Sequence, residues 1–283
     1  MNTLPLISVF SKPWPSHSAA NLSDVLLSLG FKGIELPIRE GFQVTPDTIE
    51  KALPKFASEL RQNGLGVFSI AGDVDEVTIR ACGEAGIPIL RTMLKLDSTI
   101  SYQENVDTFR RQCEELYPAI QDSGVSIGLQ NHCDGFACSS LSVIHAIEPL
   151  RSDCVSAVLD LGHTGLEGER EDLAIDIAWP RLSMINLKNA IRFPDGTDAA
   201  GAVKWNRTWV SGKEGYTSWN NVISELSKRN YSEPICITAE YKDDKMQAIV
   251  GDSVVEPLRQ DMLFLQSLLD THYETTNDAS FES

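Results

Sequence analysis

Eight short apolar runs recur along this chain of 283 residues, and each is followed by a longer amphipathic stretch. Short apolar runs bounded by glycine and polar residues indicate buried strands, whereas the longer stretches carry the periodicity of helices. We predict strands at residues 4–9, 33–36, 66–70, 88–93, 125–130, 155–160, 182–187 and 234–240. We predict helices at residues 19–29, 46–63, 73–85, 102–123, 139–150, 169–179, 217–229 and 255–273. A strand followed by a helix, eight times over, predicts an α/β fold made of a single (β/α)8 TIM barrel.

The joints between these elements have local support of their own. Thr45 followed by Pro46 is typical of a helix start, with a capping side chain and a proline in the first turn. Glycines stand where four of the helices should end, at Gly30, Gly64, Gly86 and Gly124. No segment has the composition of a linker, so we predict one barrel over residues 1–273 and a flexible polar tail over residues 274–283.

Charge and composition narrow the class of partner. The 40 acidic and 24 basic residues give a formal net charge of −16, which disfavours nucleic acid. Residues 1–15 lack the features of a signal peptide and no apolar stretch is long enough to span a membrane, so we expect a cytoplasmic protein. The six cysteines form no C-x-x-C pair and are expected to be reduced. Cys133 and Cys138 lie beside His132, but no second pair completes a zinc finger.

Polar side chains close four of the predicted strands: Gln130, Asp160, Asn186 and Glu240. A polar group at the end of a buried strand costs free energy unless it finds a partner. In a βα-barrel the C-terminal ends of the strands are where active sites are built. We therefore predict that these four side chains meet at one site.

Asp160 and His163 stand three residues apart, and Gly162 between them permits a tight turn. A carboxylate and an imidazole at this spacing suit a divalent metal or an acid/base pair. Glu240 follows a mostly apolar run, so we predict that it is either paired to a cation or is a catalytic base.

The strings around the fifth and seventh strands add polar candidates. Gln130, Asn131 and His132 can bind sugar hydroxyls or, through carbonyl oxygens, a hard cation. Asn186 and Lys188 share one face of their strand because side chains alternate. Lys188 therefore either holds an anion or an enolate oxygen, or extends into solvent.

Other positions have two interpretations each. Glu35, on the second strand, either orients a histidine or a substrate hydroxyl, or pairs with Arg39 or Arg91. Trp14 forms either an apolar wall for a sugar ring or part of the core. The segment 190–216 is unusually long for a loop after a strand, and it contains Lys204 and Arg207. We predict that it is a substrate-binding loop or lid rather than a solvated loop whose aromatic residues pack on the barrel rim.

Several segments together resemble the xylose-isomerase-like barrel superfamily of sugar isomerases and epimerases, which also includes endonuclease IV. They are GFKGIEL (30–36), VSIGLQNH (125–132), LDLGHTGLEG (159–168), INLKNA (185–190), GKEGYTSWNNVISEL (212–226) and NYSEPICITAEY (230–241). In that family Glu, Asp, His and Glu at the ends of strands five to eight hold a divalent ion. The resemblance places these ligands at Gln130, Asp160, Asn186 and Glu240, of which only Asp160 and Glu240 match by type. His163 and Lys188 match residues that are common at those positions.

The departures change the expected chemistry. Gln130 cannot accept a proton near neutral pH, which argues against a symmetrical mechanism with two carboxylate bases. With Asn186 in place of histidine, the ligand set is rich in oxygen and suits Mg²⁺ or Mn²⁺ better than Zn²⁺.

Three function classes fit both this resemblance and the composition of the chain. The leading hypothesis is a metal-assisted sugar isomerase or epimerase that abstracts a proton beside the carbonyl of a small polyol, keto-sugar or sugar derivative. Glu240, His163 and Lys188 are its predicted catalytic residues. A dehydratase or lyase on the same fold needs only one base, and a carbohydrate-binding barrel with a degenerate metal site needs none. The endonuclease alternative requires a histidine-rich metal cluster and a cationic face, which five histidines and a −16 charge do not supply.

Barrels of this class often pair through their rims, so a homodimer is expected.

Overall fold

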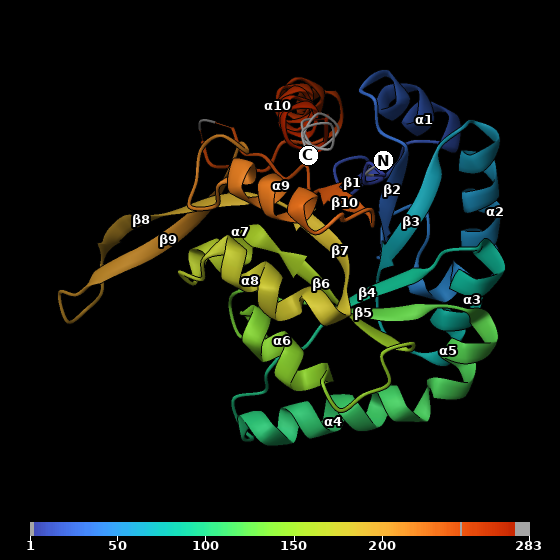
Figure 1. Cartoon of the computed structure of the whole chain (residues 1–283), viewed down its shortest axis with the longest axis horizontal. Coiled ribbons are helices and arrows are strands. Elements are labelled where there is room, and N and C mark those ends of the chain that lie inside the picture. Colours follow the sequence, from blue (N-terminus) through green and yellow to red (C-terminus); the bar gives the residue numbers. More distant parts are fainter. Residues whose placement is uncertain (1–2, 244, 275–283) are drawn as a thin grey trace, which may run out of the picture.

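The eight apolar runs close into one parallel barrel in the computed structural model, which describes residues 3–243 and 245–274 (Figure 1). The strands are β1 (Ile7–Phe10), β2 (Gly33–Pro37), β3 (Gly66–Ala71), β4 (Ile89–Met93), β5 (Ser126–Gln130), β6 (Val155–Asp160), β7 (Leu182–Leu187) and β10 (Ile235–Ile237). They follow one another around the barrel in chain order, and β1 pairs with both β2 and β10, so the two ends of the chain meet at the β1–β10 seam. The predicted (β/α)8 barrel is confirmed.

Helices cover the outside of the barrel (Figure 1). They are α1 (Ala19–Ser28), α2 (Ile49–Gln62), α3 (Glu76–Ala85), α4 (Tyr102–Glu115), α5 (Tyr117–Ser123), α6 (Ser140–Ile147), α7 (Leu161–Leu166), α8 (Glu171–Ala178), α9 (Trp219–Lys228) and α10 (Val255–Glu274), with short 3-10 turns η1 (Pro46–Thr48), η2 (Trp179–Arg181) and η3 (Gly251–Val254). Among the helices of the described residues, none has the length and hydropathy needed to cross a membrane. Residues 275–283 of the predicted tail lie outside the described part of the chain.

The described helices differ most from the prediction in two places. The helix predicted at residues 102–123 is divided into α4 and α5, because Pro118 has no N–H to donate to the carbonyl four residues earlier. The short helix α7 was not predicted, and its N-cap is the Asp160 side chain. The four predicted terminal glycines all adopt positive φ angles, of 92°, 85°, 68° and 64° in chain order.

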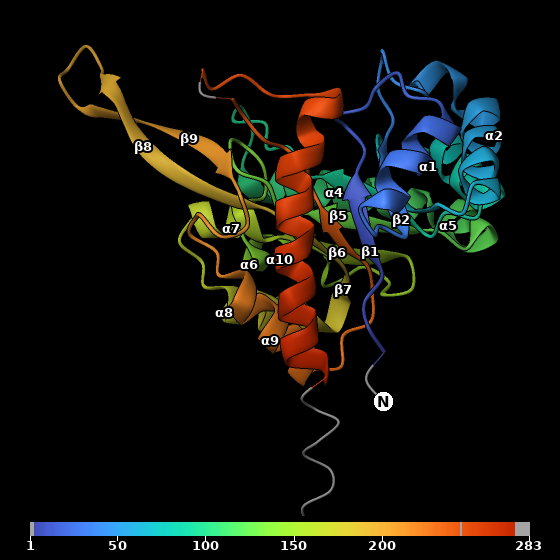
Figure 2. The ribbon, with the colours of Figure 1, turned by 90° about the horizontal axis from the view of Figure 1, so that it is seen from above.

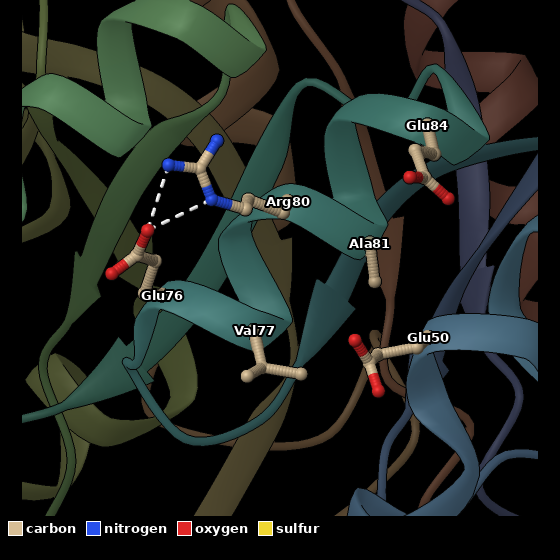
Figure 3. A pocket seen from close by; sticks show the side chains of 6 residues that line it. All are labelled: Glu50, Glu76, Val77, Arg80, Ala81 and Glu84. Atoms are coloured by element: carbon tan, nitrogen blue, oxygen red, sulfur yellow. Dashed lines mark hydrogen bonds and ion pairs between the residues drawn. The ribbon is translucent and has the colours of Figure 1, made fainter.

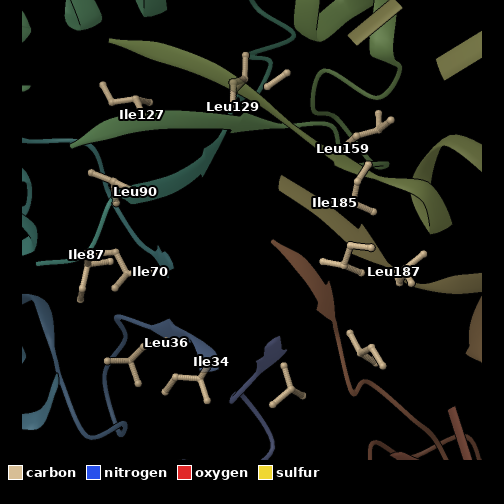
Figure 4. Packing of buried hydrophobic residues seen from close by; sticks show 14 of the residues in the cluster. Ile34, Leu36, Ile70, Ile87, Leu90, Ile127, Leu129, Leu159, Ile185 and Leu187 are labelled. Atoms are coloured by element: carbon tan, nitrogen blue, oxygen red, sulfur yellow. The ribbon is translucent and has the colours of Figure 1, made fainter. Parts of the chain in front are cut away.

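The core has two layers because strand side chains alternate. One set packs outward against the helices, and Figure 4 shows part of it, including Ile127, Leu129 and Leu159. The other set fills the barrel interior and includes Val158 and Met184. In this alternation, Asp160 and Asn186 extend the inward-facing set by one step toward the C-terminal mouth of the barrel.

The segment 190–216, predicted as a loop, is largely a β-hairpin. Strands β8 (Asn189–Thr197) and β9 (Val203–Val210) pair in antiparallel fashion and project away from the barrel (Figures 1 and 2). The outer part of the hairpin is exposed, with Trp205 65% accessible. Val203, Trp205 and Trp209 stand at alternate positions of β9 with polar residues between them, so the sequence did contain a strand pattern that the prediction of a loop did not use.

Asn189 anchors the base of the hairpin. Its Nδ2 donates to the carbonyl oxygens of Gly212 and Thr217, at 3.2 and 2.7 Å. Its Oδ1 accepts from the backbone N–H groups of Ala190 and Thr217, at 3.0 and 3.1 Å. One buried side chain thus holds both ends of the hairpin to the barrel.

We expect Asn189→Ala to lower the free energy of unfolding by about 2 kcal/mol or more, because it leaves several buried backbone groups without partners. Urea denaturation measures this loss, and limited proteolysis should detect faster cleavage near residues 211–216. The control is Asn206→Ala on β9, whose exposed side chain donates to Asp195 at 3.0 Å. Equal stability of the two variants would contradict the anchoring role.

Candidate active site

A cavity of about 250 Å³ opens at the C-terminal ends of the barrel strands. Eight of the residues predicted from sequence line it: Gln130, His132, Asp160, His163, Asn186, Lys188, Arg207 and Glu240. A hollow of similar size, about 240 Å³, lies between α2 and α3 on the outer helical layer (Figure 3). That hollow is lined by side chains of the two helices, among them the Glu76–Arg80 ion pair, and by no strand-end residue. The cavity at the barrel mouth is therefore the candidate active site.

Asp160 and His163 form the most buried polar pair of this cavity, and each is 1% exposed. Asp160 Oδ1 accepts the backbone N–H groups of Gly162 and His163, at 3.1 and 3.2 Å, and so caps α7. Asp160 Oδ2 accepts from Gln130 Nε2 at 2.9 Å and lies 3.6 Å from His163 Nε2. The Cys133 N–H donates to His163 Nδ1 at 3.3 Å, which places the proton of the neutral ring on Nε2, facing Asp160.

Burial shifts both groups of this pair toward their uncharged forms. It raises the pKa of Asp160 to about 6, against the opposing effects of Lys188 and the His163 backbone N–H. Burial, followed by the charge of Lys188, lowers the pKa of His163 well below its usual value. Near neutral pH, Asp160 is ionised but close to its pKa, and His163 is a neutral donor.

The environment of Glu240, unlike that of Asp160, favours the ionised carboxylate. The strand β10 ends at Ile237, so Glu240 is not the strand-end residue that was predicted, and a left-handed Ala239 (φ 51°) turns the chain before it. Lys12 Nζ lies 2.5 Å from Glu240 Oε1, and Lys188 Nζ donates to Oε2. Burial disfavours ionisation, but Lys188 and Lys12 outweigh it and lower the pKa of Glu240 to about 2.

Arg91 links the barrel interior to the cavity. Its Nε and Nη2 donate to Glu35 Oε1 and Oε2 at 2.6 and 2.9 Å, and its Nη1 donates to Gln130 Oε1. Ser69 Oγ also donates to Glu35, at 3.1 Å. Glu35 is fully buried below the cavity, so it has the structural pairing with Arg91 that was one of its two interpretations, and contacts no cavity space.

A family model described as "Xylose isomerase-like TIM barrel" matches residues 24–268. The chain belongs to this family. No curated protein matches the chain by sequence.

Solved structures of this family's fold cover nearly the whole chain at low sequence identity. L-ribulose 3-epimerase is 15% identical over 99% of each chain, with a TM-score of 0.72. A probable 3-DHS dehydratase from Bacillus anthracis is 16% identical over 92% of this chain and 98% of its own, with a TM-score of 0.65. A xylose isomerase-like TIM barrel protein from Mycobacterium smegmatis, in complex with magnesium, is 17% identical over 96% and 98%, with a TM-score of 0.65. Most of these structural neighbours are enzymes, among them epimerases and dehydratases.

The xylose isomerase-like barrel places the predicted metal ligands together, but their oxygen atoms already have partners. Gln130 Oε1 accepts from Arg91, both Asp160 oxygens accept hydrogen bonds, and both Glu240 oxygens contact ammonium groups. Asn186 Oδ1 alone among these side-chain oxygens is buried without a partner. The predicted Mg²⁺ or Mn²⁺ at these four residues therefore does not fit the donor set, since cations occupy the space around the carboxylate that would attract it.

A second group of potential ligands lies beside the first. His132, Cys133 and His163 offer three ligand atoms within 4.8 Å of one another, a set of nitrogen and sulfur donors that a divalent ion can use. Such donors suit Zn²⁺ better than Mg²⁺. Burial raises the pKa of the Cys133 thiol to about 12, so forming the thiolate there requires the ion itself.

Besides Glu35, three predicted substrate-binding residues lie away from the cavity. Asn131 is fully buried and clamps β5 to β6: its Nδ2 donates to the Asp160 carbonyl at 2.9 Å, and its Oδ1 accepts the Asp160 N–H at 2.7 Å. Trp14 is fully buried in the core, which agrees with the second of its two interpretations. Lys204 is exposed on the hairpin and does not line the cavity.

Sequence reasoning missed residues that complete the cavity wall. Lys12 stands two residues beyond the last residue of β1 and reaches Glu240, although nothing in its own segment suggests a site. Arg39 lines the opening, with its guanidinium 5.9 Å from the centre of the Phe10 ring. The centre of the Trp209 ring, on β9, lies 3.6 Å from Lys188 Nζ, and this ring packs edge-on to His163. A charged residue inside an apolar strand, as Arg91 is in β4, was the one available sequence signal.

Proposed function

We propose that this chain is an enzyme that removes a proton next to the carbonyl of a small carbohydrate derivative and returns it, as an isomerase or epimerase does. The observation that carries this proposal is a pair of carboxylates in opposite electrostatic states within one cavity. Burial raises the pKa of Asp160 to about 6, whereas Lys188 and Lys12 overcome burial and lower that of Glu240 to about 2. Titratable groups whose pKa values are driven apart are typical of acid and base assignments in active sites.

The proposed base differs from the one predicted from sequence. Glu240, held ionised by Lys12 and Lys188, is too weak a base to remove a carbon-bound proton efficiently. We assign the proton acceptor to Asp160, whose pKa lies near the working pH. His163 Nε2–H faces the same carboxylate, and the proton that Asp160 accepts can be returned by Asp160 itself to the substrate. No step of this mechanism requires a metal ion.

The cavity opening supports a substrate with an anionic group. Arg39 is exposed there, and within residues 3–243 and 245–274 it forms no ion pair. Arg207 approaches from β9, where its Nη1 donates to Asp134 at 3.1 Å. Two guanidinium groups at the opening suit a carboxylate or a phosphate. The proposed partner is thus a small sugar acid or sugar phosphate rather than nucleic acid.

A dehydratase or lyase is the second candidate, and one observation favours it. Only one of the two cavity carboxylates has a pKa near neutrality, so the site offers one carboxylate base rather than two opposed ones. Elimination of water from a carbon next to the enolate needs one base and then one acid, and Asp160 can act as the base and, once protonated, as the acid that protonates the leaving hydroxyl. The two candidates differ in their product, since only elimination releases water.

We expect the full chain to catalyse exchange of a substrate proton with solvent. Keto-sugars, sugar acids and their phosphates incubated in D₂O should show deuterium at the carbon next to the carbonyl in NMR spectra. Because Asp160 must be ionised to accept the proton, kcat/KM should rise as pH increases through about 6 and then level off.

The outcomes separate the three function classes. Exchange with a change of stereochemistry or carbonyl position supports an isomerase or epimerase, and an unsaturated product supports a dehydratase. A compound that binds without exchange at any pH would instead support a carbohydrate-binding barrel and contradict the proposed function. A rate that is flat between pH 5 and 8 would contradict the role of Asp160.

A further inference from the structure

The cavity carries an excess of positive charge although the protein as a whole is acidic. Among the described residues that line it, the basic side chains are Lys12, Arg39, Arg91, Lys188 and Arg207, and the acidic ones are Asp160 and Glu240. With both histidines neutral, the formal charge of this lining is +3, against −16 for the chain, and the Glu35 and Asp134 carboxylates that pair with Arg91 and Arg207 from outside the lining reduce the excess to +1. A divalent cation would enter this excess of positive charge against electrostatic repulsion.

Lys188 is built into the site. Its side chain is 6% exposed, and its Nζ lies 3.6 Å from the centre of the Trp209 ring. The space beside it exists because residue 162 is glycine: a Cβ there would lie 2.9 Å from both Lys188 Cβ and Cγ. These contacts hold the Lys188 ammonium group at the cavity, where it is buried rather than exposed on the surface.

Lys12 completes a pair around the same carboxylate. Its Nζ lies 2.5 Å from Glu240 Oε1, while Lys188 Nζ donates to Oε2. An ammonium group has three N–H donors, and Glu240 engages one donor of each lysine. Since both lysines line the cavity, their remaining donors are available to a ligand. We call these two residues the ammonium pair.

Asn186 indicates which chemical group of a ligand would lie next to the atom that the ammonium pair binds. It lies in β7 two residues before Lys188, which directly follows the end of that strand, and its Oδ1 is buried without a hydrogen-bond partner among the described residues. A buried acceptor of this kind requires a donor to avoid a desolvation cost. A hydroxyl group of a ligand supplies one, so the site is complementary to an oxygen acceptor next to a hydroxyl.

We propose that the ammonium pair, Lys12 and Lys188, takes the place of a divalent cation in this chain and binds the carbonyl oxygen of an α-hydroxy-carbonyl substrate whose hydroxyl donates to Asn186. When the C–H bond next to the carbonyl breaks, its proton goes to the Asp160 carboxylate. The C–H electron pair forms a C=C bond, and the carbonyl π pair moves to the oxygen. The ammonium pair donates hydrogen bonds to that oxygen, and the proton returns to carbon afterwards. The identity of this oxygen rests on the proposed function, whereas the replacement of the cation does not.

The test measures Mn²⁺ binding, which needs no turnover. Mn²⁺ is the probe because carboxylate oxygens suit it and thiolates do not. Titrations followed by electron paramagnetic resonance compare the wild-type full chain with Lys12→Met/Lys188→Met and with Lys55→Met, a control on α2 whose side chain is 78% exposed. We expect the double variant to bind Mn²⁺ at least tenfold more tightly than the wild type, since Asp160 and Glu240 lose their cations, and the control to match the wild type.

Two results would overturn the proposal: stoichiometric Mn²⁺ binding by the wild type, or a double variant that binds no more tightly than the wild type. Circular dichroism checks that the double variant folds. If it does not, Lys12→Met alone gives the same comparison, because that side chain is 41% exposed and tolerates change. Tighter binding by the variant together with no proton exchange by the wild type would support the replacement of the cation while counting against the proposed function.

Discussion

Asp160→Asn should reduce proton exchange by about a thousandfold, since it removes the group to which we assign proton transfer. The variant keeps an oxygen that can accept the backbone N–H groups of Gly162 and His163, at 3.1 and 3.2 Å in the wild type, so α7 should remain capped. NMR exchange assays with an identified substrate measure the effect. The matched control is Asp270→Asn on α10, an exposed carboxylate outside the cavity.

The same variant should not be less stable than the wild type at pH 7.5. Burial raises the pKa of Asp160 above its usual 3.8 to about 6, so its contribution to stability is present below pH 3.8 and is lost as the pH rises through 6. Asparagine does not ionise, so any advantage of the variant should shrink as the pH falls from 6 to 4. Urea denaturation at these pH values tests whether the stability difference between variant and wild type changes in this direction.

Proton-exchange activity of Asp160→Asn within a few-fold of the wild type would show that another residue is the base.

Arg91→Met should lower the free energy of unfolding by about 3–5 kcal/mol, because it leaves the fully buried Glu35 carboxylate without its cation. The Arg91 side chain is 6% exposed, and both terminal oxygens of Glu35 accept from it. Equilibrium urea denaturation measures the loss. Adding Glu35→Gln to Arg91→Met should restore much of it, because no charge then stays buried.

The Glu76–Arg80 pair on α3 provides the control for this prediction (Figure 3). Arg80 Nε and Nη2 donate to Glu76 Oε1 at 2.8 and 2.7 Å, but both side chains are at least half exposed. Water screens an exposed pair, so Arg80→Met should change stability by less than about 1 kcal/mol. Equal losses from Arg91→Met and Arg80→Met would show that burial does not make the difference.

The barrel was predictable because its determinants are local and periodic. The run from Val155 to Asp160 is mostly apolar and is buried throughout, and the predicted bounds of β6 agree with the structure. The hairpin formed by β8 and β9 was missed although Val203, Trp205 and Trp209 alternate with polar residues along β9, because the prediction rested on the length of the segment, which is typical of a loop. Pro118 marks the break between α4 and α5. A proline inside a helical pattern indicates such a break, but the helical periodicity of residues 102–123 was given more weight, and a single helix was predicted.

The candidate site was only partly predictable, since sequence identifies strand ends but not which distant residues meet there. Asp160, His163 and Lys188 follow from their position at strand ends, and the structure brings them together. Lys12 could not be found in this way, because its role depends on Glu240, 228 residues later. The predicted role of Glu240 as a base depends on the same contact, which turns a free carboxylate into a neutralised one.

The ion pair between Lys12 and Glu240 crosses the seam at which the first and last strands of the barrel meet. This pair joins residues that are 228 positions apart in the sequence, so forming it closes a long loop of the chain and costs loop-closure entropy. A growing or truncated chain that lacks β10 therefore has Lys188 without its carboxylate and cannot assemble the pocket. The proposed catalytic site therefore forms only when β10 pairs with β1 and closes the barrel, and a fragment that ends before β10 lacks it.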